Sequence, residues 1–254
     1  MAARVLRVIF RLDYDEVNYD FLDRQGKALR ILNSGPEGFW SRVGDGREAR
    51  SFAAEFSSEQ LHVYRNLNAS AMAIDGSVES RNGIALDDLP DNRDFRAINK
   101  ILDGFCEEFK ISRVRRCGLR LFCIESYGDN YASQFIDFAS LVDGKLTSGI
   151  EVTLGTLSDL GMSFEGKAPD GISFRLWLGP FVERDLVRIL LPRLAPSIQD
   201  EPFFKKAHVS VDLDFFEHDV SFKELTFRRW ARTHWAKADA VLRQIRSLML
   251  SRDK

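Results

Sequence analysis

The chain has 254 residues, with an apolar fraction of 44%, a charged fraction of 29% and a formal net charge of −2. This composition is typical of globular proteins, and the chain is long enough to bury a core without metals or disulfides. Proteins that coat duplex DNA carry a basic excess, so the balanced charge argues against that class. A local basic patch is still compatible with a balanced net charge.

Neither a membrane span nor a signal peptide is predicted. No window approaches the roughly 18 consecutive apolar residues of a transmembrane helix, and Met1–Phe10 lacks the apolar region of a signal peptide. We therefore expect a cytoplasmic protein without a membrane partner.

The three cysteines match no metal or redox motif. Cys106, Cys117 and Cys123 are odd in number, and their spacings do not form a C-x-x-C pair. A zinc site needs about four nitrogen or sulfur ligands, and no second Cys/His cluster is evident. We expect buried, reduced thiols and no cofactor.

The N-terminal third predicts a strand, a helix and further strands. Val5–Tyr14 is rich in β-branched and aromatic residues, as strands are. Asn18–Leu32 has the apolar pattern of a helix, weakened by Gly26. Partial alternation between turn residues predicts three antiparallel strands, at Ser51–Phe56, Gln60–Leu67 and Ser70–Ser77.

The clearest local element is an amphipathic helix that begins after Pro90. Its apolar residues recur at spacings of three and four, which places them on one helical face: Phe95, Ile98, Leu102, Phe105 and Phe109. A strand is predicted directly after it, at Val114–Ile124.

The second half predicts one short helix, four strands and a long final helix. The short helix is Tyr131–Val142. The predicted strands are Ile150–Leu154, Gly161–Glu165, Ile172–Leu178 and Ala207–Phe216. The final helix runs from about Phe222 to Leu250, with apolar residues that step by four and three.

Strands and helices are grouped rather than strictly alternating. This favours an α+β fold, with mostly antiparallel sheet packed by amphipathic helices, over a doubly wound parallel sheet. We predict a single domain, 1–254. The alternative is an internal duplication with lobes at about 1–125 and 126–254, because VIFRLDYDEVNYDF (Val8–Phe21) resembles VSVDLDFFEHDVSF (Val209–Phe222).

Two aspartates share one face of the last predicted strand. Asp212 and Asp214 alternate with apolar residues, so both side chains point the same way. Two carboxylates on one strand face can hold Mg²⁺. Nucleotidyltransferases use such a pair together with an upstream Gly-Ser loop, but Phe203–Lys206 stands where that loop belongs. The favoured interpretation is the wet face of a half-buried strand.

The last helix carries a histidine and a basic surface. His234 lies on its apolar line, and no catalytic partner can be named from the sequence, so we expect a packed histidine with one hydrogen-bonded nitrogen. Arg228 and Arg232 lie mostly off that line, interleaved with Trp230 and Trp235. Exposed arginines and aromatics can bind single-stranded nucleic acid. The favoured interpretation is a solvated face whose tryptophans anchor the core.

Arginines also gather around the predicted central strand. Arg116 and Arg120 would share one strand face, and either could bind a ligand. An arginine clamps a carboxylate through two parallel hydrogen bonds, and we expect Arg120 to find an internal partner in Asp212 or Asp214. Nucleophile elbows, phosphate loops and dinucleotide-binding glycine motifs are missing from the sequence.

The central strand carries a resemblance to a known family. Arg113–Ile124 reads RVRRCGLRLFCI. It resembles the central strand of a sporadically distributed bacterial family of uncharacterised proteins of similar length, whose signature is Arg-x-Gly-Leu-Arg-Tyr-x-Asn. The positions that match are Arg116, Gly118, Leu119 and Arg120. Leu121 and Cys123 depart from the aromatic and the Asn of that signature.

The resemblance extends to both ends of the chain. Val5–Leu12 is similar to the family's opening strand, Val211–Asp214 to its late Leu-Asp-x-Asp strand, and the helix with His234 to its histidine-bearing helix. The family has no established activity to carry over. Its patchy occurrence is similar to that of accessory genes, including defence-associated ones, which implies an association rather than a mechanism.

Because no complete catalytic constellation is present, we expect a non-enzymatic binding or interaction factor, accessory to a stress or defence locus. Its partner would be another protein or further copies of itself. One alternative is a metal-dependent nucleotide or nucleic-acid enzyme that uses Asp212 and Asp214. Another is an RNA or single-stranded nucleic-acid binder that uses the arginine and tryptophan surfaces.

Overall fold

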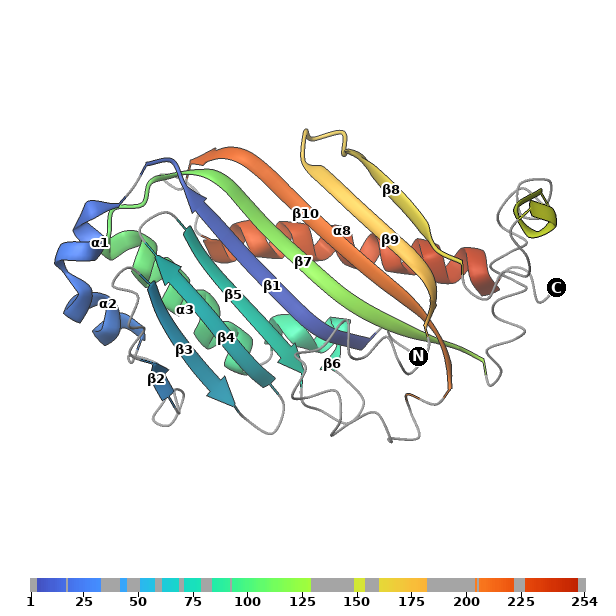
Figure 1. The fold of residues 1–254 in the computed structure, drawn as a ribbon, viewed down its shortest axis with the longest axis horizontal. Helices are drawn as coiled ribbons and strands as arrows, with labels where there is room; N and C mark the ends of the chain where they lie inside the picture. The colour runs from blue at the N-terminus through green and yellow to red at the C-terminus, as the bar shows by residue number, and fades with distance from the viewer. Residues whose placement is uncertain are drawn as a thin grey trace.

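The computed structural model describes residues 4–16, 18–32, 42–44, 51–57, 61–68, 71–78, 84–91, 93–128, 149–153, 160–181, 204, 206–221 and 227–250. They form a mixed α+β fold, in which short helices and one long C-terminal helix pack on an antiparallel sheet (Figure 1).

The strands of the first half are β1 (Arg4–Tyr14), β2 (Arg42–Gly44), β3 (Ser51–Ser57), β4 (Leu61–Asn68), β5 (Ala71–Val78) and β6 (Ile84–Ala85). Those of the second half are β7 (Arg113–Gly128), β8 (Met162–Lys167), β9 (Ser173–Phe181) and β10 (Ala207–Ser221). The helices are α1 (Tyr19–Asp23), α2 (Gln25–Leu32), the 3₁₀ helix η1 (Leu86–Asp91), α3 (Arg93–Glu108) and α8 (Phe227–Leu250).

The described strands form a single sheet with the order β2-β3-β4-β5-β1-β7-β10-β9-β8, and β6 pairs with the start of β1. Every pairing is antiparallel. The two long strands β1 and β10 lie on either side of β7, so β7 is hydrogen-bonded along both edges in the middle of the sheet.

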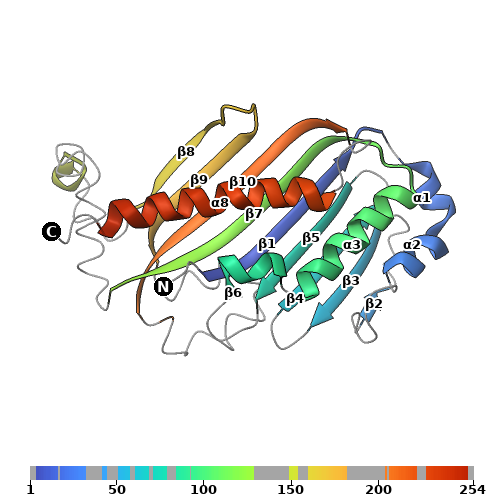
Figure 2. The same cartoon turned by 180° about the vertical axis from the view of Figure 1, so that it is seen from behind.

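Both α3 and α8 lie across the same face of this sheet, which we call the helix face (Figure 2). Alternate residues of the central strands point toward them and are buried: Val8, Phe10, Leu119, Leu121, Leu213 and Phe215. Phe105 of α3 and Phe109, directly after the helix, add to the same core, with ring centroids 4.6 Å apart. The core thus lies between one sheet face and two helices.

Several sequence expectations are confirmed. The predicted strands at Val5–Tyr14, Val114–Ile124 and Ala207–Phe216 correspond to β1, β7 and β10, and the helix after Pro90 is α3. All three cysteines are free and buried, and Cys117 and Cys123 share the apolar face of β7 with its leucines. Among the described residues, no helix is long and apolar enough to cross a membrane.

The helix predicted over Asn18–Leu32 is two short helices. The break falls at Arg24, whose side chain bonds to both Asp20 and Glu108, at 2.6 and 3.2 Å. These bonds fix the residue to the end of α3. Gly26 stands in the first turn of α2, where its low helix propensity does little to extend a helix across the break.

One predicted strand is wrong. Ile150–Leu154 was expected to be a strand because of its β-branched residues, yet residues 149–153 form a helical turn. Thr153 Oγ1 donates to the carbonyl oxygen of Gly149 at 2.9 Å, and Val152 is 88% exposed. β-branched residues favour a strand only where a neighbouring strand packs against them, and composition alone does not show whether one does. The helix predicted at Tyr131–Val142 lies outside the described residues.

The connectivity of the sheet repeats itself. The first half begins on β1, ends on β5 beside it, and continues through η1 into α3. The second half begins on β7, ends on β10 beside it, and continues to α8. The strands whose sequences echo each other, β1 and β10, are therefore not equivalent in this repeat, and the division into two lobes stays a prediction.

Candidate functional site

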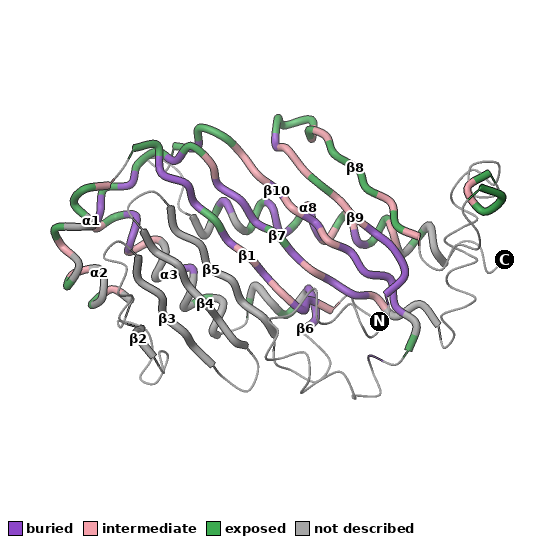
Figure 3. Tube along the Cα trace, viewed as in Figure 1, coloured by how far each residue is buried: buried purple, intermediate pink, exposed green. Residues whose placement is uncertain are grey.

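The sheet face opposite α3 and α8, which we call the open face, gathers four of the residues singled out in the sequence. In Figure 1 the viewer looks onto this face, and α8 passes behind the strands. Because side chains alternate along a strand, Arg116 and Arg120 of β7 point away from the buried leucines. Asp212 and Asp214 do the same on β10, and Figure 3 shows the resulting alternation of buried and less buried positions.

Arg120 is clamped by Asp212 on the neighbouring strand. Its Nε and Nη2 atoms donate to the two carboxylate oxygens at 2.8 and 2.6 Å. The hydrogen bond to Asp212 raises the pKa of the Arg120 guanidinium against the opposing effect of burial. The expectation of an internal partner for Arg120 is confirmed, with the bidentate geometry that an arginine and a carboxylate prefer.

Asp214 lies beside the second arginine of β7. The distance from Arg116 Nη2 to Asp214 Oδ2 is 3.7 Å, and only 16% of the aspartate side chain is exposed. Burial raises the pKa of Asp214, and the charge of Asp212 adds to this, while the neighbouring arginines oppose it. The Arg116–Asp214 pair is therefore longer and less exposed to solvent than the Arg120–Asp212 pair.

Aromatic rings fill the spaces between these ion pairs. The guanidinium groups of Arg7 and Arg120 lie 5.6 and 4.7 Å from the ring centroid of Phe122. Those of Arg116 and Arg175 lie 4.8 and 5.8 Å from that of Phe216. Each ring thus lies between two cations, within the range of a cation–π attraction.

Trp177 of β9 extends this layer toward the sheet edge. A Cβ atom at Gly161 would lie 2.8 Å from the indole ring, and one at Gly179 would lie 2.9 Å from the carbonyl oxygen of Leu160. The two glycines thus leave room for the indole on the sheet. By contrast, a Cβ at Gly118 would meet only ordinary contacts, and β7 has no register shift there, so this glycine marks neither a bulge nor a close approach.

Acidic partners balance the arginines of the open face. Besides the pairs of Arg116 and Arg120, Arg11 lies 2.8 Å from Asp13 and Arg175 lies 3.1 Å from Glu165. The face therefore combines positive, negative and aromatic groups without a large excess of either charge.

His234 lies on the other side of the sheet. It is 1% exposed, stacked on Trp230 and edge-on to Phe215. Its Nδ1 donates to the carbonyl oxygen of Trp230 at 2.8 Å, and burial lowers its pKa, so the neutral ring carries its proton on Nδ1. The expected packed histidine with one hydrogen-bonded nitrogen is confirmed.

The favoured interpretation of the α8 surface, a solvated face whose tryptophans anchor the core, is confirmed for the tryptophans. Trp230 and Trp235 are 2% and 7% exposed, and Trp230 Nε1 donates to Glu217 at 2.8 Å. They anchor the helix and cannot stack on bases. Arg232 is exposed on α8, away from the open face, and the side chain of Arg228 lies outside the described part of the structure.

The geometry gives little support to a metal site at Asp212 and Asp214. Both carboxylates lie beside arginines, whose charge would oppose a cation. Among the residues that the structure describes, no three His, Cys, Asp or Glu side chains gather to hold a metal. Metal binding at these aspartates stays a prediction.

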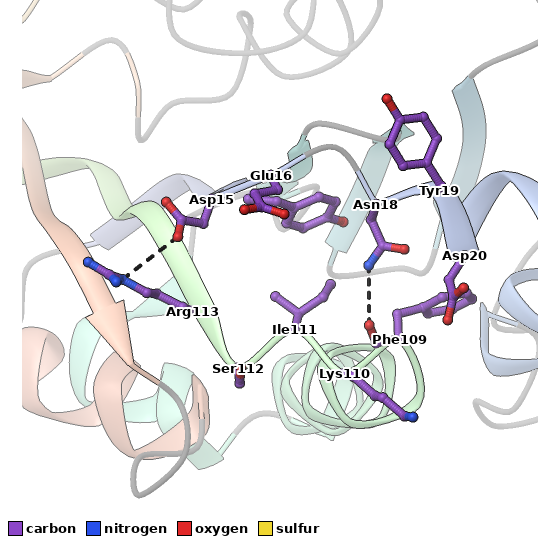
Figure 4. Close-up of a pocket in the computed structure, with 11 residues that line it drawn as sticks. Asp15, Glu16, Asn18, Tyr19, Asp20, Phe109, Lys110, Ile111, Ser112 and Arg113 are labelled. Atoms are coloured by element: carbon purple, nitrogen blue, oxygen red, sulfur yellow. Dashed lines mark hydrogen bonds and ion pairs between the residues drawn. The ribbon is translucent and has the colours of Figure 1, made fainter.

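A polar cleft of about 440 Å³ lies where β1 ends and α3 turns into β7 (Figure 4). Arg113 lies 3.8 Å from Asp15 on one side of it, and Asn18 Nδ2 donates to the carbonyl oxygen of Phe109 at 3.2 Å on the other. Lys110 has a φ of 52° and closes α3 through the paired backbone bonds of a Schellman turn. These contacts account for the polar groups as supports of a helix end.

Sequence reasoning found Arg116, Arg120, Asp212 and Asp214 but missed four other residues of the open face: Arg7, Arg175, Trp177 and Phe216. Alternation along each strand places them on that face. What brings them together is the register between β1, β7, β10 and β9.

The chain was compared with known proteins. No family model, no curated protein sequence and no solved structure matches it. The resemblance to the sporadically distributed bacterial family therefore stays a prediction, and the function must be inferred from the geometry.

Proposed function

We propose that the chain is a non-enzymatic interaction protein and that two copies bind each other through their open faces. The observation that carries this proposal is the arrangement of charge in the middle of the sheet. Arg120 of β7 is the direct cross-strand partner of Asp214 of β10, while Arg116 lies opposite His218 and Asp212 lies opposite Phe122.

The Arg120–Asp214 pair makes the centre of this face complementary to itself. A half-turn about an axis that runs parallel to the strands, between β7 and β10, places the β7 column of one copy against the β10 column of the other. Residues of one cross-strand pair then oppose each other between copies, so Arg120 meets Asp214 of the second copy, twice per dimer. This is the isologous geometry of most homodimers.

The residue types of the open face also fit a protein partner. Arginine and aromatic residues are enriched in the centres of protein interfaces. The ion pairs within each copy are partly exposed, with Arg120 44% and Arg175 60% accessible, and such pairs cost little to rearrange. Charged groups on both copies then fix the register of the contact more than its strength.

Sedimentation velocity with charge-reversed variants tests this proposal. We expect the wild-type chain to dimerise, and Arg120→Asp and Asp214→Arg each to weaken the dimer by at least about tenfold, since close like charges cost several kcal/mol. The double variant Arg120→Asp/Asp214→Arg restores the pair and the dimer. Arg232→Asp, at an exposed position of α8, is the matched control and leaves the dimer intact.

Two outcomes would overturn the proposal: a wild-type chain that is monomeric at every accessible concentration, or a dimer that Arg232→Asp disrupts as much as Arg120→Asp does. If Arg120→Asp does not fold, Arg120→Gln removes the attraction without adding repulsion and is expected to weaken the dimer in the same direction.

Single-stranded nucleic acid is the second candidate partner, favoured by the arginine–phenylalanine contacts of the same face. Such binding predicts an affinity that falls with salt and weakens in Phe122→Ala, because stacked bases lose a platform. Fluorescence anisotropy with a labelled oligo(dT) measures this directly. Binding that is indifferent to salt and to Phe122→Ala would remove the candidate.

A further inference from the structure

An apolar cavity of about 570 Å³ lies on the helix face, between the β9–β10 pair and the middle of α8. The sheet contributes Phe174, Leu176, Leu213 and Phe215, and α8 contributes Ala240 and Val241. Small-molecule sites in proteins occupy about 300–1,000 Å³ and are lined in the same way, by apolar side chains with a few polar groups.

The polar groups of this cavity lie together. Lys237 of α8 forms an ion pair with Asp170, in the turn between β8 and β9, and both residues line the cavity. Their side chains are 26% and 48% exposed, so the pair lies where the cavity meets solvent. An ion pair this exposed is weak and is readily exchanged for another carboxylate.

Charge at this rim favours an anionic head group. Lys167 also lines the cavity and makes no ion pair with any residue that the structure describes, so two lysines accompany one aspartate. A carboxylate that replaced Asp170 at Lys237 would keep that ammonium paired.

His234 does not line the cavity but lies next to two residues that do. It lies one helical turn before Lys237 on the same side of α8, and its ring contacts Phe215, which lines the cavity. Its Nε2 is buried without a hydrogen-bond partner among the described residues. A buried nitrogen of this kind is uncommon and often marks a place where a water or ligand belongs.

We propose that this cavity binds an aliphatic carboxylic acid, with its hydrocarbon chain between α8 and the β9–β10 strands and its carboxylate on Lys237. The site is separate from the open face and does not depend on the dimer.

Isothermal titration calorimetry of the delipidated full chain with octanoate, decanoate and dodecanoate, each below its micelle concentration, tests the proposal. Each added pair of methylenes is expected to tighten binding by about tenfold, because every buried methylene adds a similar increment. Failure of all three acids to bind, or an affinity that does not grow with chain length, would overturn it.

Two pairs of variants locate the ligand. Ala240→Trp places an indole at a position that lines the cavity and is expected to weaken dodecanoate binding by more than about tenfold. Ala236→Trp, at an exposed position of the same helix that does not line the cavity, leaves it unchanged. Lys237→Gln weakens dodecanoate but not dodecanol, and Arg232→Gln weakens neither. Equal binding of acid and alcohol to the wild type would overturn the role of Lys237, and indifference to Ala240→Trp would overturn the cavity.

Discussion

On the helix face, residues that pair across the strands are apolar: Val8, Leu121, Leu213 and Leu176 form one continuous row. On the open face, the adjacent row contains Arg120, Asp214, Arg175 and Glu165. Three strands, β7, β10 and β9, contribute to both rows and present two surfaces that are one residue out of phase. The apolar rows stabilise the fold without directional contacts, and the charged rows specify what can be placed against them.

The largest expected difference between the faces is in stability, and two neighbours on β7 measure it. Leu121→Ala removes a fully buried side chain and is expected to lower the free energy of unfolding by about 2–5 kcal/mol. Phe122→Ala, on the open face, removes a half-buried ring and is expected to cost less, about 1–2 kcal/mol. Urea unfolding followed by circular dichroism compares them, and equal losses would contradict the division.

A smaller effect is expected at the glycines next to Trp177. Gly179→Ala places a Cβ atom 2.9 Å from a backbone oxygen and about as close to the indole, so it is expected to cost about 1–3 kcal/mol. Gly26→Ala, in a helix with open space around it, is the control and is expected to stabilise by about 0.5–1 kcal/mol. A neutral Gly179→Ala would mean that Trp177 does not pack as described.

The third effect is a pH dependence of stability, which we expect from the buried histidine of the helix face. Burial lowers the pKa of His234 in the folded chain, so the unfolded chain binds a proton more readily. Stability from this residue is present above a pH of about 6.5 and is lost as the pH falls below it. His234→Gln is expected to flatten that slope. Urea midpoints between pH 5 and 7.5 check this.

The smallest effect is expected at the edge of the open face. Glu165 and Arg175 are 62% and 60% exposed, and Glu165→Gln is expected to change stability by less than about 0.5 kcal/mol. A thermal or urea melt that differs from the wild type by much more than this would show that the ion pairs of the open face contribute to the fold itself.

The sequence was sufficient where local pattern decides the structure. The residue pattern identified β1, β7 and β10, and the three-and-four spacing identified α3. The sequence also narrowed the partner of Arg120 to Asp212 or Asp214, and the structure shows that it is Asp212. Each of these depends on residues close in sequence or on one strong charge pairing.

The rest depends on contacts that one strand or helix cannot encode. The aromatic layer of Phe122 and Phe216 requires the register of β7 against β10. The burial of Trp230 and Trp235 requires α8 to lie on the sheet, so the sequence alone left a nucleic-acid stacking surface open as an alternative to core anchors. Residues 149–153 had the composition of a strand but are paired with none.

The central claim, that Arg120 of one copy opposes Asp214 of another, is tested most directly by mixing the two charge-reversed variants. Arg120→Asp and Asp214→Arg each place like charges across the dimer axis, so each alone is expected to sediment as a monomer. In a mixture, both contacts pair opposite charges, and native mass spectrometry is expected to detect the heterodimer and neither homodimer. A mixture that stays monomeric while the wild type dimerises would contradict this account of the interface.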